Sequence, residues 1–254
     1  TNATLAIPTK RLLPDQLAFD STSYTEHRKQ TVLTWQGILD RAVQVQVPEA
    51  RVNRAWRSLL VQNFMLLQDD RMLYSAGNQY ERLYETEGSK AVMAFLAWGY
   101  EDEASRMITP LLDFTRKGLE NHQASIKLQN VVRYWLQTRD LEWVRKMRPR
   151  WKKELDRILK ERNEATGLLP KERYCGDIST PVHSLSVDAK AWRSLLDLPI
   201  MLRALGESEL ADQVSQTQGE YKRKLDVALQ RSLRTDTMPP FVPIALLANE
   251  GVHD

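Results

Sequence analysis

The strongest constraint on the fold is a helical spacing of apolar residues that recurs along most of the chain. Val32, Trp35, Ile38 and Leu39, for example, follow one another at intervals of three and one, as on one face of an α-helix. Further segments with this spacing lie near 49–68, 85–98, 101–117, 121–138, 140–162, 185–205 and 207–232. Glycine and proline are few, 10 and 11 among 254 residues, which disfavours sandwiches and barrels with their frequent turns. The sequence therefore predicts an all-α fold of about eight helices.

A helix–glycine–helix pattern occurs twice and indicates how these helices are arranged. An apolar helix ends at Gly99 and an acidic segment with alanine restarts after it, and the same order surrounds Gly206. Glycine is favoured just beyond a helix because it adopts the left-handed conformation without a steric penalty. Repeated helical hairpins bury their apolar faces against neighbouring hairpins. We therefore expect an array of α/α hairpins.

Segments without periodicity mark the boundaries. Residues 1–25 are polar and irregular, and we expect a linker or the tail of a preceding domain there. Residues 26–254 are then the hairpin domain. Within it, 69–84 and 170–184 are expected to be long loops, and 43–47 a short extended piece that ends at a proline.

Composition excludes several functions. The net charge is only +3, with basic and acidic residues interleaved, so we expect no nucleic-acid partner. No apolar run approaches the ~18 residues of a membrane span. The four histidines are scattered and Cys175 is the single cysteine, so neither a metal site nor a thiol nucleophile is indicated. No phosphate-binding or dinucleotide motif occurs, and we expect no cofactor.

Four passages give the chain a resemblance to a known group of proteins. They are Val52–Leu60, which has the character of an entry helix; Tyr74–Glu87, a loop followed by a helix; Tyr134–Trp143, a helix, a short turn with Asp and an aromatic residue; and Gly167–Pro170. In these passages, which are spread over about 28–235, the chain resembles the six-hairpin glycosidases. This is the (α/α)6 toroid group that includes glucoamylase-like and α-L-rhamnosidase-like enzymes.

The resemblance implies an α/α-hairpin toroid. Because about eight of the twelve helices of a complete ring are found, it implies an incomplete (α/α)6 barrel that is part of a longer protein. It also implies an oligosaccharide or polysaccharide as partner. The sequence does not determine the compartment, although a periplasmic or secreted location fits a glycan-degrading role.

Glycoside hydrolysis needs two carboxyl groups, one as acid and one as base or nucleophile. In the resembling families, loops at one end of the hairpins supply them. By position, the resemblance indicates Glu172 and then Asp177 as general acid, with the second carboxylate beyond residue 254. Lys171 and Arg173 bracket Glu172, however, and would lower its pKa, which does not suit an acid. A solvated charged loop is the alternative for both residues.

The predicted substrate-binding residues come from the loop and helix start at 69–87 and from the helix after residue 184. They are Tyr80, Glu81, Arg82, Tyr84, Glu85, Glu87, Asp188 and Trp192. Sugars offer CH faces to aromatic rings and hydroxyl edges to planar polar groups, and these residues provide both. The alternatives are structural. Glutamates favour the first turn of a helix, and the tyrosines and Trp192 also suit packing between hairpins.

Three functions follow from these features. The first is a glycoside hydrolase-like domain that works by acid–base catalysis. The second is a non-catalytic helical scaffold that binds glycan or protein through the same aromatic residues, so whether the chain is an enzyme stays open. The third is an (α/α) lyase or sugar epimerase, which would need His or Tyr as base.

Overall fold

The computed structural model describes residues 21–73 and 82–248 and consists mostly of helices, which confirms the all-α prediction. The chain divides into two compact units, of which one ends at Met65 and the other begins at Leu66. The predicted boundary at 25/26 stays a prediction, although a helix already begins at Ser21. Each unit is described by itself below.

The first unit is a pair of helices, α1 (Ser21–Arg41) and α2 (Ala50–Met65). The Trp35 ring meets the Phe64 ring edge-on, with the ring centroids 6.3 Å apart. The connection is held by Asn53, whose side chain both accepts from the Val47 N–H and donates to the Val47 carbonyl. Residues 43–47 form no strand in the structure.

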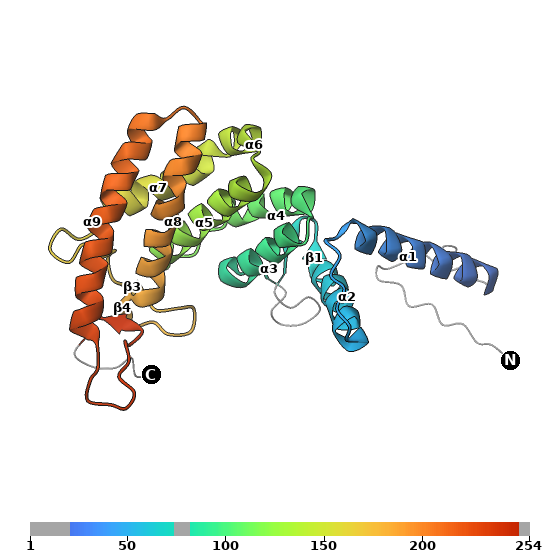
Figure 1. Ribbon diagram of the computed structural model, residues 1–254, viewed down its shortest axis with the longest axis horizontal. Coiled ribbons are helices and arrows are strands. Elements are labelled where there is room, and N and C mark those ends of the chain that lie inside the picture. The colour runs from blue at the N-terminus through green and yellow to red at the C-terminus, as the bar shows by residue number, and fades with distance from the viewer. Residues whose placement is uncertain (1–20, 74–81, 249–254) are drawn as a thin grey trace. The chain divides into compact units, whose positions relative to one another are not determined.

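The second unit contains seven helices among the residues described (Figure 1). They are α3 (Glu85–Ala97), α4 (Glu101–Asp113), α5 (Glu120–Thr138), α6 (Leu141–Lys146), α7 (Arg148–Lys160), α8 (Leu185–Ala204) and α9 (Ser208–Ser232). Helix α5 packs on α3 and on α8, and we call these three helices the first row. The second row is α4, α7 and α9, each packed on a first-row helix. The core between them holds fully buried aromatic residues, among them Phe95, Trp151 and Tyr221.

The two predicted glycine turns have the same geometry. Gly99 has φ 88° and Gly206 has φ 84°, both left-handed. After α3, the Tyr100 N–H donates to the Phe95 carbonyl, and after α8, the Glu207 N–H donates to the Leu202 carbonyl. This hydrogen bond closes a Schellman motif and lets each helix turn directly into the next one. The predicted α3–α4 and α8–α9 hairpins are therefore confirmed.

The predicted helix 140–162 is two helices in the structure. Asp140 caps α6, since its Oδ1 accepts from the Trp143 N–H at 2.9 Å. The chain then breaks at Met147, and α7 begins with Arg148 and Pro149. Proline lacks an N–H and is favoured in the first turn of a helix, where the N–H has no acceptor in the helix, so Pro149 suits the start of a new helix here.

Both predicted long loops contain short strands. In the first, β2 (Arg71–Met72) forms an antiparallel hairpin with β1 (Leu67–Gln68), which lies where the sequence predicted the end of the helix 49–68. Its turn is Asp69-Asp70, both with positive φ, as a two-residue hairpin requires. In the second, β3 (Glu172–Arg173) pairs with β4 (Pro181–Ser184), and β5 (Ala245–Leu246) adds to β4. None of the helices described is both long and apolar enough to cross a membrane.

Candidate functional site

Three connecting segments lead into the N-terminal ends of the first-row helices. They are residues 66–84 before α3, 114–119 before α5 and 161–184 before α8. Arg116 touches the other two segments. Its guanidinium carbon lies 6.0 Å from the centre of the Tyr84 ring, and a Cβ added at Gly176 would overlap its guanidinium. The two loops that the sequence predicted to hold functional residues are therefore brought together through Arg116.

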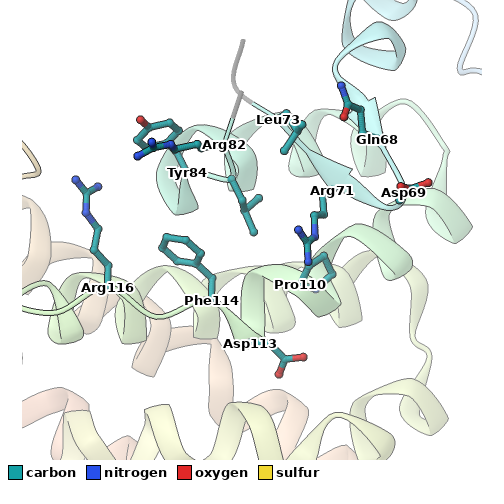
Figure 2. Close-up of a pocket in the computed structure, with 11 residues that line it drawn as sticks. Gln68, Asp69, Arg71, Leu73, Arg82, Tyr84, Pro110, Asp113, Phe114 and Arg116 are labelled. Carbon is teal, nitrogen blue, oxygen red and sulfur yellow. The ribbon is translucent and has the colours of Figure 1, made fainter. Parts of the chain in front are cut away.

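A cavity of about 1200 Å³ lies beside this contact (Figure 2). Its walls are the β1–β2 hairpin, residues 82–84 and the C-terminal end of α4 with the residues that follow it. Three arginines and two aromatic residues are among the side chains that line the cavity, and we call it the arginine–aromatic pocket. They are Arg71, Arg82, Arg116, Tyr84 and Phe114.

The pocket combines aromatic surface with guanidinium groups. Tyr84 and Phe114 are half-buried, so each presents part of its ring to the cavity. Arg71 and Arg82 are exposed, and neither forms an ion pair with any residue that the structure describes. Their donors therefore remain available to a bound molecule.

Two carboxylates also line the pocket. Asp69 is in the turn of the β1–β2 hairpin, and Asp113 is the last residue of α4. Asp113 accepts a hydrogen bond of 2.7 Å from Nε of Arg150. The neighbouring Asp70 accepts one of 3.0 Å from Nε of Arg106, which ties the hairpin to α4.

Of the predicted substrate-binding residues, Arg82 and Tyr84 line this pocket. Glu85 and Glu87 lie in the first turn of α3, where Glu85 is buried and Glu87 is exposed. Both glutamates thus lie where the structural alternative placed them, in the first turn of a helix. Tyr80 and Glu81 lie outside the described residues.

The predicted acid Glu172 is buried against the start of α5. Its Oε2 accepts from the Asn121 N–H at 2.9 Å, and its Oε1 accepts from the His122 N–H at 2.7 Å. The expectation that Lys171 and Arg173 lower the pKa of Glu172 is wrong, because burial raises this pKa to about 7, against the two N–H donors, which lower it. Both carboxylate oxygens thus accept hydrogen bonds from N–H groups in the first turn of α5, as in helix capping.

Asp177, the other predicted acid, is exposed on the tip of the β3–β4 hairpin. Neither Glu172 nor Asp177 lines the arginine–aromatic pocket. Their catalytic roles stay predictions.

Asp188 and Trp192 contact residues outside the pocket. Asp188 is buried, and its Oδ1 accepts from the Tyr221 hydroxyl at 2.6 Å and from the Leu169 N–H at 2.9 Å. Burial raises the pKa of Asp188, although both donors lower it. Trp192 is half-buried, with Nζ of Lys222 from α9 5.7 Å from its ring centre. Neither residue lines the pocket, and their substrate-binding roles stay predictions.

A histidine not singled out from the sequence lies close to the same helix ends. Nε2 of His122 is 2.8 Å from the Thr86 hydroxyl of α3. Burial, with Lys190 and Arg116 nearby, lowers its pKa to about 4, so His122 is neutral at physiological pH. This contact joins the first turns of α3 and α5.

The sequence did not identify Arg71, Phe114 or Arg116. The predicted helix 101–117 ran past the true end of α4 at Asp113, which hid the short segment that holds Phe114 and Arg116. Pro110 did not mark this end, because it lies inside α4, just as Pro199 lies inside α8.

Comparison with protein-family models, with curated proteins and with solved structures finds no match for the chain.

Proposed function

We propose that this chain is a carbohydrate-binding α/α-hairpin domain of the six-hairpin glycosidase type, with its ligand in the arginine–aromatic pocket. The observation that carries the proposal is the placement of Tyr84 and Phe114 beside three arginines around one cavity of about 1200 Å³. Such a cavity is large enough for a sugar chain of a few units.

The chemistry of a pyranose matches these side chains. Its axial CH groups form an apolar face that packs on an aromatic ring, and its equatorial hydroxyls need planar donors and acceptors at the edge. A guanidinium presents five N–H donors in one plane, and Asp69 adds an acceptor. Aromatic faces with planar polar groups around them are what the sequence predicted for a sugar site.

The arrangement of the helices supports the toroid part of the proposal. A ring of α/α hairpins consists of an inner and an outer row, with successive hairpins side by side. The first row α3, α5 and α8 and the second row α4, α7 and α9 have this order. The candidate pocket lies at the end where the first-row helices begin, and in the resembling families loops at one end of the hairpins supply the catalytic groups.

Hydrolysis of a glycosidic bond is a second candidate, and Asp69 and Asp113 are the carboxylates beside the pocket. An inverting hydrolase needs an acid and a base on opposite sides of the sugar, but the Asp113 carboxylate is bound by Arg150 and points away from Tyr84 and Phe114 (Figure 2). Glu172 and Asp177 remain the acids that the resemblance indicates. Binding needs none of the four and is the function that the geometry supports best.

Calorimetric titration of the protein with a panel of oligosaccharides tests the binding proposal. We expect Tyr84→Ala and Phe114→Ala each to weaken binding at least tenfold, because each removes one stacking face. Phe241→Ala is the matched control, since Phe241 is a half-exposed aromatic residue outside the pocket. Equal affinity for all three variants and the wild type would refute the pocket assignment.

Release of reducing ends from the same oligosaccharides tests hydrolysis. Asp69→Asn, Asp113→Asn, Glu172→Gln and Asp177→Asn are compared with the wild type. Loss of release in one variant with sugar affinity retained identifies a catalytic carboxylate. Binding without any release, on the other hand, supports the non-catalytic scaffold.

A further inference from the structure

A second hollow lies along the first-row helices, between α3, α5 and α8. It has a volume of about 370 Å³. Four cationic side chains line it: Lys90 of α3, Arg133 of α5, and Lys190 and Arg193 of α8. No carboxylate lines it among the described residues, and we call it the cationic groove.

Most of this positive charge is not neutralised. Arg193 forms an ion pair with Asp197 one turn further along α8. Lys90, Arg133 and Lys190 form no ion pair with any residue in 21–73 or 82–248.

Lys190 shows that these charges act on one another. Its pKa is lowered by burial and by the nearby Lys90, while Glu85 and Glu87 at the start of α3 raise it. A protonated amine that is partly desolvated beside another cation is stabilised when an anion binds next to it. The groove therefore favours an anionic ligand over a neutral one.

The floor of the groove carries a neutral donor as well. Nδ2 of Asn130 donates to Oγ of Ser89 at 2.8 Å, which leaves the Ser89 hydroxyl hydrogen without an acceptor among the described residues. Nε2 of Gln129 donates to the Lys190 carbonyl at 3.0 Å and fixes α5 against α8. Ser89 is buried and held in place, so its hydroxyl can donate to a ligand without a further loss of side-chain entropy.

We propose that the cationic groove binds the negatively charged groups of an acidic oligosaccharide, so that the carbohydrate of this chain is a polyanion. The inference rests on the proposed function, since it names the class of sugar that the domain takes. It draws on different residues, because no side chain lines both the groove and the arginine–aromatic pocket. The arginines of that pocket fit the same class, since guanidinium groups bind carboxylates through paired hydrogen bonds.

An uronic acid oligomer and its methyl ester are matched probes, because esterification removes the charge and leaves the sugar chain unchanged. We would titrate the protein with tetragalacturonate and with its fully methyl-esterified form at low and at 0.5 M salt. The inference predicts that the acid binds at least tenfold more tightly than the ester at low salt. It also predicts that salt removes most of this difference, since salt screens charge interactions near a surface.

A double variant locates the interaction. Lys90→Gln with Arg133→Gln removes two exposed charges from the groove, and Arg145→Gln with Lys146→Gln removes two exposed charges from α6 as a control. All four side chains are exposed, so both variants are expected to fold as the wild type. We expect at least a tenfold loss of tetragalacturonate affinity in the groove variant and less than a twofold loss in the control.

The outcomes separate the two proposals. Equal affinity for acid and ester, with dependence on Tyr84, overturns the polyanion inference and keeps the carbohydrate-binding proposal. Equal losses in the groove and control variants overturn the groove as the site. If neither acid, ester nor neutral oligosaccharides bind, both proposals fall together.

Discussion

The backbone N–H of His122 donates to Oε1 of Glu172 at 2.7 Å across 50 residues of sequence. With the Asn121 N–H on the other oxygen, this bond makes Glu172 the cap of α5, supplied by a distant strand. A carboxylate near a helix N-terminus is stabilised by the helix dipole and satisfies donors that have no partner within the helix. The contact fastens β3 to the first row of helices.

Replacing Glu172 should therefore destabilise the protein whether or not it is catalytic. Glu172→Ala leaves two N–H groups at the start of α5 without their acceptor, one of them on the buried Asn121. We expect a loss of about 2–3 kcal/mol in the free energy of unfolding at pH 5, measured by urea denaturation, and a smaller loss at pH 7.5, where burial of the ionised carboxylate offsets the cap. Glu164→Ala, in an exposed turn, is the control and should change stability by less than about 0.5 kcal/mol. A loss no larger than that of the control would show that the cap contributes little.

His122 and Glu172 should give opposite pH dependences. The folded-state pKa of His122 is about 4, below 6.5, so its contribution to stability is lost as the pH falls from about 6.5 to about 4. The folded-state pKa of Glu172 is about 7, above 4.5, so its contribution is lost as the pH rises from about 4.5 to about 7. Between pH 7.5 and pH 5 each effect amounts to about 2 kcal/mol, and the two nearly cancel.

Single variants should uncover these two effects. Compared with the wild type, His122→Gln should gain about 2 kcal/mol on going from pH 7.5 to pH 5, because the loss due to histidine protonation is gone. Glu172→Gln should lose about the same amount over this interval. Urea titrations at both pH values measure the differences, and a change of the same sign in both variants would contradict the assignment.

The hairpin turns were predictable because their causes are local. An apolar helix followed by glycine needs only neighbouring residues to form a Schellman motif, and this holds at Gly99 and Gly206. The break at Met147 was missed because the apolar spacing continues across it, although Pro149 marked the start of a new helix. Strands β1 to β5 are two to four residues long and give no periodic pattern.

The site was less predictable because its contacts are not local. Arg82 and Tyr84 were found since they lie in a polar, aromatic segment next to a helix start. Arg116 becomes a site residue only because the fold brings Tyr84 and Gly176 to it. The capping role of Glu172 likewise depends on a helix start about 50 residues earlier, and no local pattern carries that information.

Substitution of the turn glycines should separate backbone strain from steric overlap. A Cβ at Gly206 would meet no atom within 4 Å. Gly206→Ala should therefore lower the free energy of unfolding by about 1–2 kcal/mol, only because an alanine is strained in the left-handed conformation. A Cβ at Gly167 would lie 2.6 Å from Cβ of Lys224, so Gly167→Ala should cost more. Gly219→Ala, inside α9 with nothing closer than 3.9 Å, should instead stabilise the helix by up to about 1 kcal/mol. Thermal unfolding of the three variants measures this order, and equal losses at 206 and 167 would contradict it.

The hydrogen bond from Tyr221 to Asp188 should depend on pH in a defined way. Tyr221→Phe removes the donor at 2.6 Å and leaves the buried carboxylate with only the Leu169 N–H, so we expect a loss of about 1–3 kcal/mol at pH 7.5. Tyr134→Phe is the control, since its hydroxyl lies 3.4 Å from Asp140 in a less buried place, and it should cost under about 1 kcal/mol.

Lowering the pH should reduce the loss in the free energy of unfolding that Tyr221→Phe causes. Burial already raises the pKa of Asp188, and the Tyr221 hydroxyl opposes that rise, so its removal raises this pKa further. Because a raised pKa costs stability only where the unfolded carboxyl is ionised, the loss should shrink as the pH falls towards 3.8. Urea titrations at pH 7.5 and pH 4 measure this, and an equal loss at both values would contradict it. If Asp188→Asn keeps wild-type stability but loses oligosaccharide affinity, the predicted substrate-binding role of Asp188 would be supported instead.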